Sequence, residues 1–412
     1  MVNKQRLQAQ MDAVGAFGGL PVKGLSRLAF SQEEKDARVY VTSLMREIGM
    51  HIEEDAIGNI IGRIEGELPL SGVAAGSHLD SVPQGGHYDG TLGVMCALEA
   101  IRCIKENGIA HKRPLELIIF SCEESSRFNM ATVGSKVMSG KLPLEKLHAL
   151  KDKQGVSLYQ AAKAFGCDVD SLAKAKRDEN SFYSYLELHI EQGPALEAKK
   201  IPVGIVTGIA APIRYEVLIH GRADHSGATP MNMRQDALVC ASSIILGVEE
   251  IALHQAGPTT VATVGFANAL PGVLNVIPGE VKLGIDIRDI DNTNLEKANA
   301  LIVAMIENVA TNRGLTCTLT QLTKDRPTVL DQEIVTLLNE EAQKLGIETI
   351  ELPSGAGHDA MHMPHVAQFT GMLFIPCKEG ISHNVAEEID MEDAFKATQL
   401  LTQSMIKLAN KE

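Results

Sequence analysis

Two near-continuous apolar runs flank a segment with helical periodicity, and this order restricts the chain to few folds. Val73–Ser77 and Leu115–Ser121 lack polar alternation, as do strands of a sheet that is covered on both faces. Between them, LGVMCALEAIRCIKENG repeats its apolar residues at helical spacing and closes at Gly108. Strand, helix and strand in this order predict a parallel sheet in an α/β domain. Two later apolar runs, Tyr185–Ile190 and Met372–Pro376, predict further strands of that sheet.

The middle of the chain follows a different pattern, which predicts a second domain inserted into the first. The segments IRYEVLIHG, TVATVGFANA, EVKLGIDIRD and LTCTLTQL read as strands, and Gln235–His254 and Asn294–Asn312 read as helices. Their order is β-α-β-β-α-β, the split pattern of ferredoxin-like domains. We therefore predict a catalytic domain in two parts, residues 1–210 and 327–412, with a compact α+β domain inserted at 211–326.

The composition is that of a globular protein and disfavours two classes of partner. Of 412 residues, 45% are hydrophobic and 22% charged, which suits a folded protein of two or three domains. The formal net charge of −14 disfavours nucleic acids and anionic membranes, which bind clustered Lys and Arg. The sequence predicts no membrane span and no signal peptide, so we expect a cytoplasmic protein. Seven cysteines without a C-x-x-C pair argue against a disulfide framework.

Imidazoles and carboxylates follow the predicted strands, at the edge where parallel sheets carry their active sites. The segment GSHLDSVPQGGHYDG follows the first run, a glutamate pair follows the second, and LELHIEQGP and SHN hold two further histidines. Nitrogen and oxygen ligands of this kind bind zinc or a similar borderline metal. The candidate ligands are His78, Asp89, Glu124, His189 and His383. Five ligands suit two ions about 3.5–4 Å apart, with one carboxylate bridging them.

Each of these features also has an ordinary structural explanation. His78 and Asp80 share a strand face, as they would at a capped strand end. Asp89 is equally typical of a helix N-cap. The adjacent Glu123 and Glu124 are more often a solvated pair, but at the mouth of a buried strand the pKa of one should rise unless a cation lies between them. A metal would let one carboxylate ligate and leave the other to accept a proton from water.

Six segments together resemble the hydantoinase/carbamoylase family of di-metal amidohydrolases, over nearly the whole chain. In order they are GSHLDSVPQGGHYDG, EESSRF, ELHIEQGP, GRADHSGATPM, PGVLNVIPGE and GAGHDA. The family includes N-carbamoyl-L-amino acid hydrolases, β-ureidopropionases, and allantoate and ureidoglycolate amidohydrolases. The resemblance implies a zinc-peptidase-like catalytic domain with a central, mostly parallel sheet. It also implies an inserted ferredoxin-like domain that serves as a lid or dimerisation domain, and hence a homodimer.

The resemblance also implies a ligand set for two divalent metal ions per subunit. His78 and His189 would hold one ion, Glu124 and His383 the other, and Asp89 would bridge them. Zinc is the expected metal, with manganese, cobalt and nickel as alternatives.

Catalytic and substrate-binding roles follow from the same resemblance. Glu123 would be the general acid and base, Asp80 would orient His78, and His225 would stabilise the oxyanion of a tetrahedral intermediate. Arg288 would clamp the substrate carboxylate, although an ion pair with a neighbouring aspartate is the commoner use of such an arginine. The remaining substrate contacts would be Gln192, Asn275, Gly357 and His358.

These roles predict hydrolysis of the ureido C–N bond of an N-carbamoyl-L-amino acid, with release of the amino acid, ammonia and carbon dioxide. Allantoate and ureidoglycolate share the ureido group and the carboxylate, so their amidohydrolases are the alternative. FNMATVGS lacks an aromatic pair typical of one allantoate branch, which favours carbamoyl amino acids. An aminoacylase or a dipeptidase is a further alternative. A non-catalytic binding protein is disfavoured, because it would be expected to have lost ligands or the base.

Overall fold

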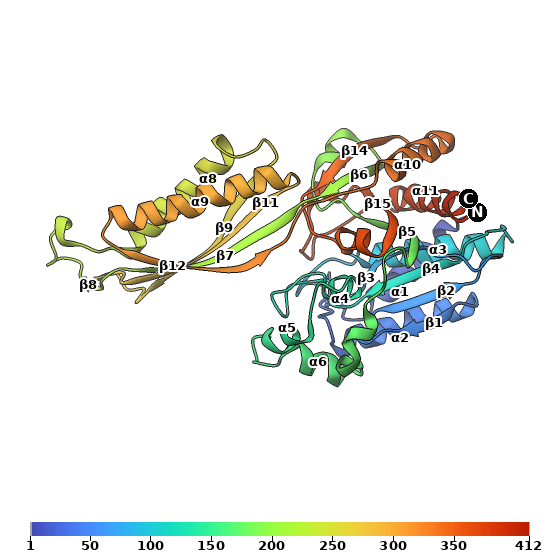
Figure 1. Cartoon of the computed structure of the whole chain (residues 1–412), viewed down its shortest axis with the longest axis horizontal. Coiled ribbons are helices and arrows are strands. Elements are labelled where there is room, and N and C mark those ends of the chain that lie inside the picture. Colours follow the sequence, from blue (N-terminus) through green and yellow to red (C-terminus); the bar gives the residue numbers. More distant parts are fainter. Residues whose placement is uncertain (1, 412) are drawn as a thin grey trace. The chain divides into compact units, whose positions relative to one another are not determined.

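The computed structural model describes residues 2–411, which divide into two compact units (Figure 1). The second unit comprises Gly208–Val329 and Pro353–Gly357, and the first unit comprises the rest of the described chain. The sequence placed an inserted domain at 211–326. The short segment Pro353–Gly357 lies within the predicted second part of the catalytic domain, 327–412, but the structure groups it with the second unit.

A sheet of nine strands has the order β1-β2-β4-β3-β5-β15-β6-β13, with β14 paired to β6; β13 belongs to the second unit, and the other strands lie wholly or mostly in the first. The four inner strands β4, β3, β5 and β15 are parallel to one another, whereas β1–β2, β2–β4 and β15–β6 are antiparallel pairs. The predicted mostly parallel sheet is therefore confirmed. The strands are β1 (His51–Glu54), β2 (Ile60–Ile64), β3 (Gly72–His78), β4 (Leu115–Phe120), β5 (Phe182–Ile190), β6 (Val203–Ile209), β13 (Thr328–Val329), β14 (Thr349–Ser354) and β15 (Ala367–Ile375).

Two apolar clusters form the core of the first unit. The larger one packs side chains of α1, α2, α3, α10 and α11 against the inner strands, and the smaller one gathers α4, α5, α6 and η1. Helix α3 is buried along almost its whole length, as its apolar sequence predicts. The helices are α1 (Lys4–Gly15), α2 (Gln32–Glu47), α3 (Thr91–Glu106), α4 (Val133–Met138), α5 (Leu144–Ala149), α6 (Leu158–Phe165), α7 (Ala195–Lys199), α10 (Gln332–Leu345), α11 (Met391–Ala409), η1 (Val169–Ala175), η3 (Asp359–Met361), η4 (Met363–His365) and η5 (Lys378–Gly380).

The second unit is a four-stranded antiparallel sheet, in the order β12-β7-β11-β9, with two helices packed on it. Along β7 and β11 buried residues alternate with half-exposed ones, so one face of the sheet meets the helices and the other stays open. Apart from short β8, β10 and η2, the elements follow the predicted β-α-β-β-α-β order. They are β7 (Ala211–His220), β8 (Asp224–His225), η2 (Met231–Met233), α8 (Ala237–His254), β9 (Val261–Leu270), β10 (Val276–Ile277), β11 (Glu280–Asp289), α9 (Asn292–Asn312) and β12 (Thr316–Lys324).

One helix of the described chain, α8, is long and apolar enough to cross a membrane, with a mean hydropathy of 1.6. We expected no membrane span from the sequence, and by length and composition alone α8 is an exception to that expectation. The helix packs along α9 and against the sheet, and it buries one face that includes Cys240, Ile244 and Val248. Its apolar side chains thus contribute to the core of a packed α+β unit.

Candidate active site and metal centre

The parallel strands of the first unit deliver the predicted ligands to one edge of the sheet. His78 is the last residue of β3, His189 is the second-last residue of β5, and Glu123 and Glu124 follow shortly after β4. Each of these four residues is buried. This arrangement is the one expected at the carboxyl ends of neighbouring parallel strands.

Asp89 reaches the same place through the turn that precedes α3. The N-cap of α3 is Gly90, with φ +64°, and it makes no side-chain capping bond, so Asp89 is not the cap that the sequence also allowed. A β-carbon on Gly90 would lie 2.3 Å from His78 Nε2. Glycine is therefore required at this position both for its backbone conformation and for the space that the imidazole occupies.

The five predicted ligands come together in two groups that share Asp89. His78, Asp89 and His189 form one group, and Asp89, Glu124 and His383 form the other, with the candidate ligand atoms of each group within 4.8 Å of one another. Asp89 Oδ1 lies 3.1 Å from His189 Nε2 and 3.7 Å from His78 Nε2. Asp89 Oδ2 lies 3.1 Å from His383 Nε2, which is 3.3 Å from Glu124 Oε1. Asp89 thus offers one oxygen to each group.

The two histidines at the strand ends are oriented as metal ligands usually are. His78 Nδ1 lies 2.9 Å from the backbone oxygen of Asp80, and His189 Nδ1 lies 2.9 Å from that of Ile190. A carbonyl can only accept, so Nδ1 carries a proton, and once Nε2 has lost its own proton its lone pair points to the ligand group.

Charge in the site is balanced by imidazolium groups next to carboxylates. Burial alone would raise the pKa of Asp89, but hydrogen bonds with His189 and His383 hold it well below its ordinary value. Burial opposes a charge on His189, yet its bond with Asp89 raises its pKa to about 9. Bonds with Asp89 and Glu124 raise the pKa of His383 to about 11. Divalent cations can replace these protons with larger charges, so the donor set and its charge both fit a pair of metal ions.

Asp80 contributes to the site differently from the prediction. Its carboxylate was expected to hold His78, but Asp80 Oδ1 lies 3.7 Å from His78 Nδ1, and the backbone carbonyl of Asp80 makes that contact instead. The carboxylate accepts hydrogen bonds from the backbone N–H groups of Glu123, at 3.1 Å, and Glu124, at 3.0 Å. Asp80 therefore fixes the glutamate pair.

Glu123 lies beside the ligands without belonging to either group. Its Oε2 is 3.7 Å from His78 Nε2. Burial first, and then the charge of Glu124, raise the pKa of Glu123 well above its ordinary value. A buried carboxyl group with a raised pKa next to a metal centre suits a general acid and base.

Two residues that the sequence did not single out hold the ligand loops together. Glu387 is buried, and its Oε1 accepts hydrogen bonds from the backbone N–H groups of Tyr88 and Asp89, at 2.9 and 3.2 Å. Its Oε2 accepts one from Ser382 Oγ, which also lies 3.2 Å from Asp89 Oδ2. Gln192, predicted as a substrate contact, donates to Asp89 Oδ2 at 2.9 Å.

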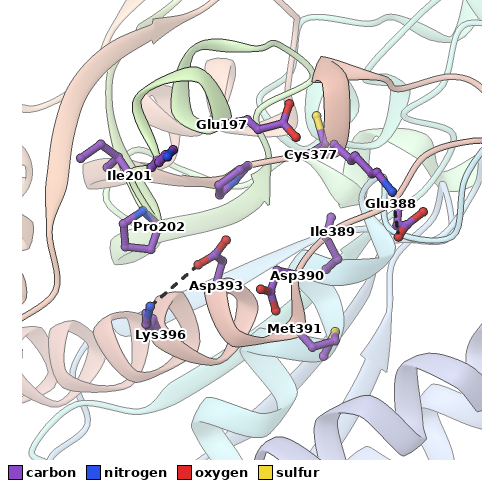
Figure 2. A pocket seen from close by; sticks show the side chains of 13 residues that line it. Glu197, Ile201, Pro202, Cys377, Glu388, Ile389, Asp390, Met391, Asp393 and Lys396 are labelled. Atoms are coloured by element: carbon purple, nitrogen blue, oxygen red, sulfur yellow. Dashed lines mark ion pairs between the residues drawn. The ribbon is translucent and has the colours of Figure 1, made fainter.

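A cavity of about 610 Å³ is lined by residues that flank the segment 379–387 in the sequence, among them Cys377, Glu388 and Ile389 (Figure 2). Lys378 and Glu388, at the two ends of this segment, both line the cavity. They are joined by a backbone hydrogen bond of 2.8 Å and an ion pair of 3.5 Å, which close the base of the segment.

The predicted substrate contacts divide between the two units. His358, in the first unit, is buried, and its ring meets that of His189 edge-on at 4.6 Å. Gln192 also lies in the first unit, and the remaining four lie in the second unit: His225, Asn275, Arg288 and Gly357. His225 and Asn275 are neighbours there, because β8 pairs with β10 and the N–H of Ser226 donates to the carbonyl of Asn275.

His225 is exposed and oriented as a donor. Its Nδ1 accepts hydrogen bonds from the backbone N–H groups of Gly227, at 3.0 Å, and Ala228, at 3.1 Å. In the neutral ring the proton is therefore on Nε2, which is free to donate to a developing oxyanion.

Arg288 forms an ion pair with a neighbouring aspartate, Asp286, which is the commoner use of such an arginine. Its Nε and Nη2 donate to the carboxylate of Asp286, each at 3.1 Å, and its Nη1 donates to the carbonyl of Gly355 at 3.2 Å. Three of the five N–H donors are used, so two remain for a second carboxylate. Asp286 also binds Arg214.

Arg288 and His225 lie at opposite ends of the sheet of the second unit. Arg288 is near the end of β11, whereas β8 lies beyond the Glu280 end of that strand (Figure 1). At about 3.3 Å per residue, the eight residues from Glu280 to Arg288 alone span about 26 Å.

Known proteins resemble this chain over its whole length. The family model for peptidase family M20/M25/M40 matches residues 74–407. An uncharacterised hydrolase of Haemophilus influenzae is 44% identical over 99% of both chains, and an N-carbamoyl-L-amino acid amidohydrolase of Geobacillus stearothermophilus is 40% identical over 100% of both. The crystal structure of a hydantoinase/carbamoylase family amidase from Burkholderia multivorans matches with a TM-score of 0.89 and 34% identity, covering 100% of this chain and 98% of the other. A ureidoglycolate hydrolase of rice and an allantoate amidohydrolase of Bacillus subtilis are 37% and 33% identical.

Proposed function

The chain belongs to peptidase family M20/M25/M40 and is a hydrolase of amide bonds, and from this premise we propose that it cleaves the ureido C–N bond of N-carbamoyl-L-amino acids. The products would be the free amino acid, ammonia and carbon dioxide. The observation that carries the proposal is the pair of ligand groups that share Asp89, with Glu123 beside them and outside both. Three relatives at 38–40% identity over 93% or more of this chain are N-carbamoyl-L-amino acid amidohydrolases, which supports this substrate class. Ureidoglycolate hydrolases at 36–37% identity make ureidoglycolate the second candidate.

The residues of the chain have distinct tasks in this reaction. Two divalent cations, zinc in the first instance, would be held by the two groups, where they would polarise the ureido carbonyl and lower the pKa of water. Glu123 takes the proton of the attacking water and returns it to the leaving nitrogen. The Nε2–H of His225 stabilises the oxyanion, and the two unused N–H groups of Arg288 hold the substrate carboxylate.

The substrate is tested by ammonia release from a panel of N-carbamoyl amino acids, allantoate and ureidoglycolate, with protein reconstituted with zinc, manganese, cobalt or nickel. We expect the highest kcat/KM for an N-carbamoyl-L-amino acid, and no activity after the metal is removed with a chelator. A preference for allantoate or ureidoglycolate would show that N-carbamoyl-L-amino acids are not the substrate class. Full activity without metal would refute the proposal.

Removal of the Arg288 guanidinium should mainly damage binding of carboxylate-bearing substrates. We expect Arg288→Ala to raise KM for these substrates roughly 10²-fold, since a charge-assisted bidentate bond of about 3 kcal/mol is lost. Arg214→Ala is the matched control, because it removes the other guanidinium bound to Asp286. An unchanged ratio of kcat/KM between a carbamoyl amino acid and its neutral amide would contradict the clamp.

We also propose a cytoplasmic homodimer, in which His225 of each subunit acts at the site of its partner. One small substrate cannot contact both ends of a sheet that is about 26 Å long, so Arg288 and His225 of one chain serve different sites. Helix α8 offers a surface for the second copy, since its exposed side includes Leu238, Leu246 and Leu253.

Subunit mixing tests this arrangement. His225→Ala and Glu123→Gln homodimers should both be nearly inactive. Mixed dimers keep one complete site, so random reassociation should restore about a quarter of the unmodified activity. No recovery in dimers whose mixing is verified by mass spectrometry would place His225 at the site of its own subunit, and an active His225→Ala homodimer would place it outside catalysis.

A further inference from the structure

Arg27 is a fully buried arginine in the segment between α1 and α2, and it makes no ion pair among the described residues. Burial lowers the pKa of Arg27 to about 10, so the guanidinium is charged at neutral pH. A charge in the interior usually stabilises a fold less than an apolar side chain of similar size would. What an apolar side chain could not supply here are the four hydrogen bonds that the guanidinium donates.

The contacts of Arg27 enclose the segment that carries two predicted metal ligands. Its Nε donates to the carbonyl of Leu79 at 2.6 Å, directly after His78. Its Nη2 donates to Thr91 Oγ1 at 2.7 Å, two residues after Asp89. Its Nη1 donates to the carbonyls of Val14 and Phe17, at 2.8 and 3.0 Å, which ties the segment to the end of α1.

The backbone around Arg27 continues this attachment along the loop. The N–H of Arg27 donates to Ser81 Oγ, and the N–H of Ser81 donates to the carbonyl of Arg27, at 2.9 and 2.8 Å. Leu25 and Gly85 exchange two backbone hydrogen bonds. The segment that contains Leu25 and Arg27 thus holds the loop from residue 79 to residue 91 from one side. This segment lies outside the family match, which begins at residue 74.

We propose that Arg27 is a positioning residue that holds His78 and Asp89 at the separation that the metal ions require. The inference rests on the metal centre of the proposed function and goes beyond it, since it assigns the support of that centre to the N-terminal segment. Partners behind metal ligands typically change metal affinity 10- to 100-fold when they are removed.

The test is metal binding to the metal-stripped protein, measured for Zn²⁺ by competition with a chelator. We expect Arg27→Met to weaken Zn²⁺ binding by about tenfold or more. Arg113→Met is the matched control, because Arg113 is also buried and contacts Tyr183 and the carbonyl of Ser71, at the opposite ends of the parallel strands. It should leave Zn²⁺ affinity within about twofold, and the melting temperatures of both variants show how far each is destabilised.

Equal Zn²⁺ affinities of the Arg27→Met and Arg113→Met proteins would overturn the inference. If Arg27→Met does not fold, Thr91→Val carries the test, since it removes one acceptor of the guanidinium and keeps the shape of the side chain. It should weaken Zn²⁺ binding several-fold, and an unchanged affinity would likewise overturn the inference. The readout needs no substrate, so a protein that binds metal as expected but cleaves no ureide would defeat the proposed function alone.

Discussion

Replacement of Glu123 by glutamine is expected to lower kcat roughly 10³- to 10⁴-fold while both metal ions stay bound. The amide has the size of the carboxyl group but cannot take a proton from water or return it to the leaving nitrogen. Because Glu123 lies outside both ligand groups, the loss should fall on proton transfer, which corresponds to about 4–5.5 kcal/mol in the barrier. The measurements are kcat by ammonia release and metal content by mass spectrometry.

Glu341→Gln is the matched control for this change. Glu341 lies on α10 and is 8% exposed, as is Glu123, so the two variants neutralise carboxyl groups of equal burial. Activity of the Glu341 variant should stay near that of the unmodified protein. If Glu123→Gln keeps more than about a tenth of the activity, another group must be the base.

The second large effect is expected from a single methyl group at Gly90. In Gly90→Ala the β-carbon would lie 2.3 Å from His78 Nε2, so the imidazole must leave its place or the turn must move. Both movements separate His78 from Asp89, and we expect a loss of at least about 10²-fold in metal affinity and in kcat/KM. Calorimetric metal titration and ammonia release measure the two losses independently.

Gly108→Ala is the control that separates two effects of Gly90→Ala: the collision of the new methyl group with His78, and the conformational strain of a non-glycine residue at positive φ. Gly108 follows the other end of α3 with φ +60°, and an added β-carbon there would meet nothing within 4 Å. This variant should lose about 1–2 kcal/mol of stability and keep its metal affinity. If the two alanine variants behave alike, the left-handed backbone rather than the space beside His78 makes glycine necessary.

The inner strands could be predicted from the sequence because they are apolar on both faces. Val73–Ser77 and Leu115–Ser121 lie almost at the bounds of β3 and β4. The outer strands gave no comparable signal: β1 is four residues long and mostly exposed, so nothing in its composition distinguishes it from a loop. An edge strand is specified by its partner, which a single sequence does not reveal.

The candidate ligands could be predicted because metal chemistry restricts them to a few residue types at the ends of strands. The residues that hold these ligands in place could not be predicted. Most contacts of Glu387 and Arg27 are with backbone N–H and carbonyl groups, which nearly every residue has, so no spacing or residue type marks these partners. The same reason explains Asp80, whose carboxylate binds two amides after β4 and not the imidazole two residues before it.

The interrupted path of the chain has a consequence for its synthesis. Strand β15 lies between β5 and β6 in the sheet, and α11 packs on α3, yet both are encoded after the whole of Gly208–Val329. On the ribosome the segment Gly208–Val329 can fold while the larger unit still lacks β15 and α11. His383 is the last of the five candidate ligands to emerge, so the group of Asp89, Glu124 and His383 is complete only after the whole of Gly208–Val329 has been made.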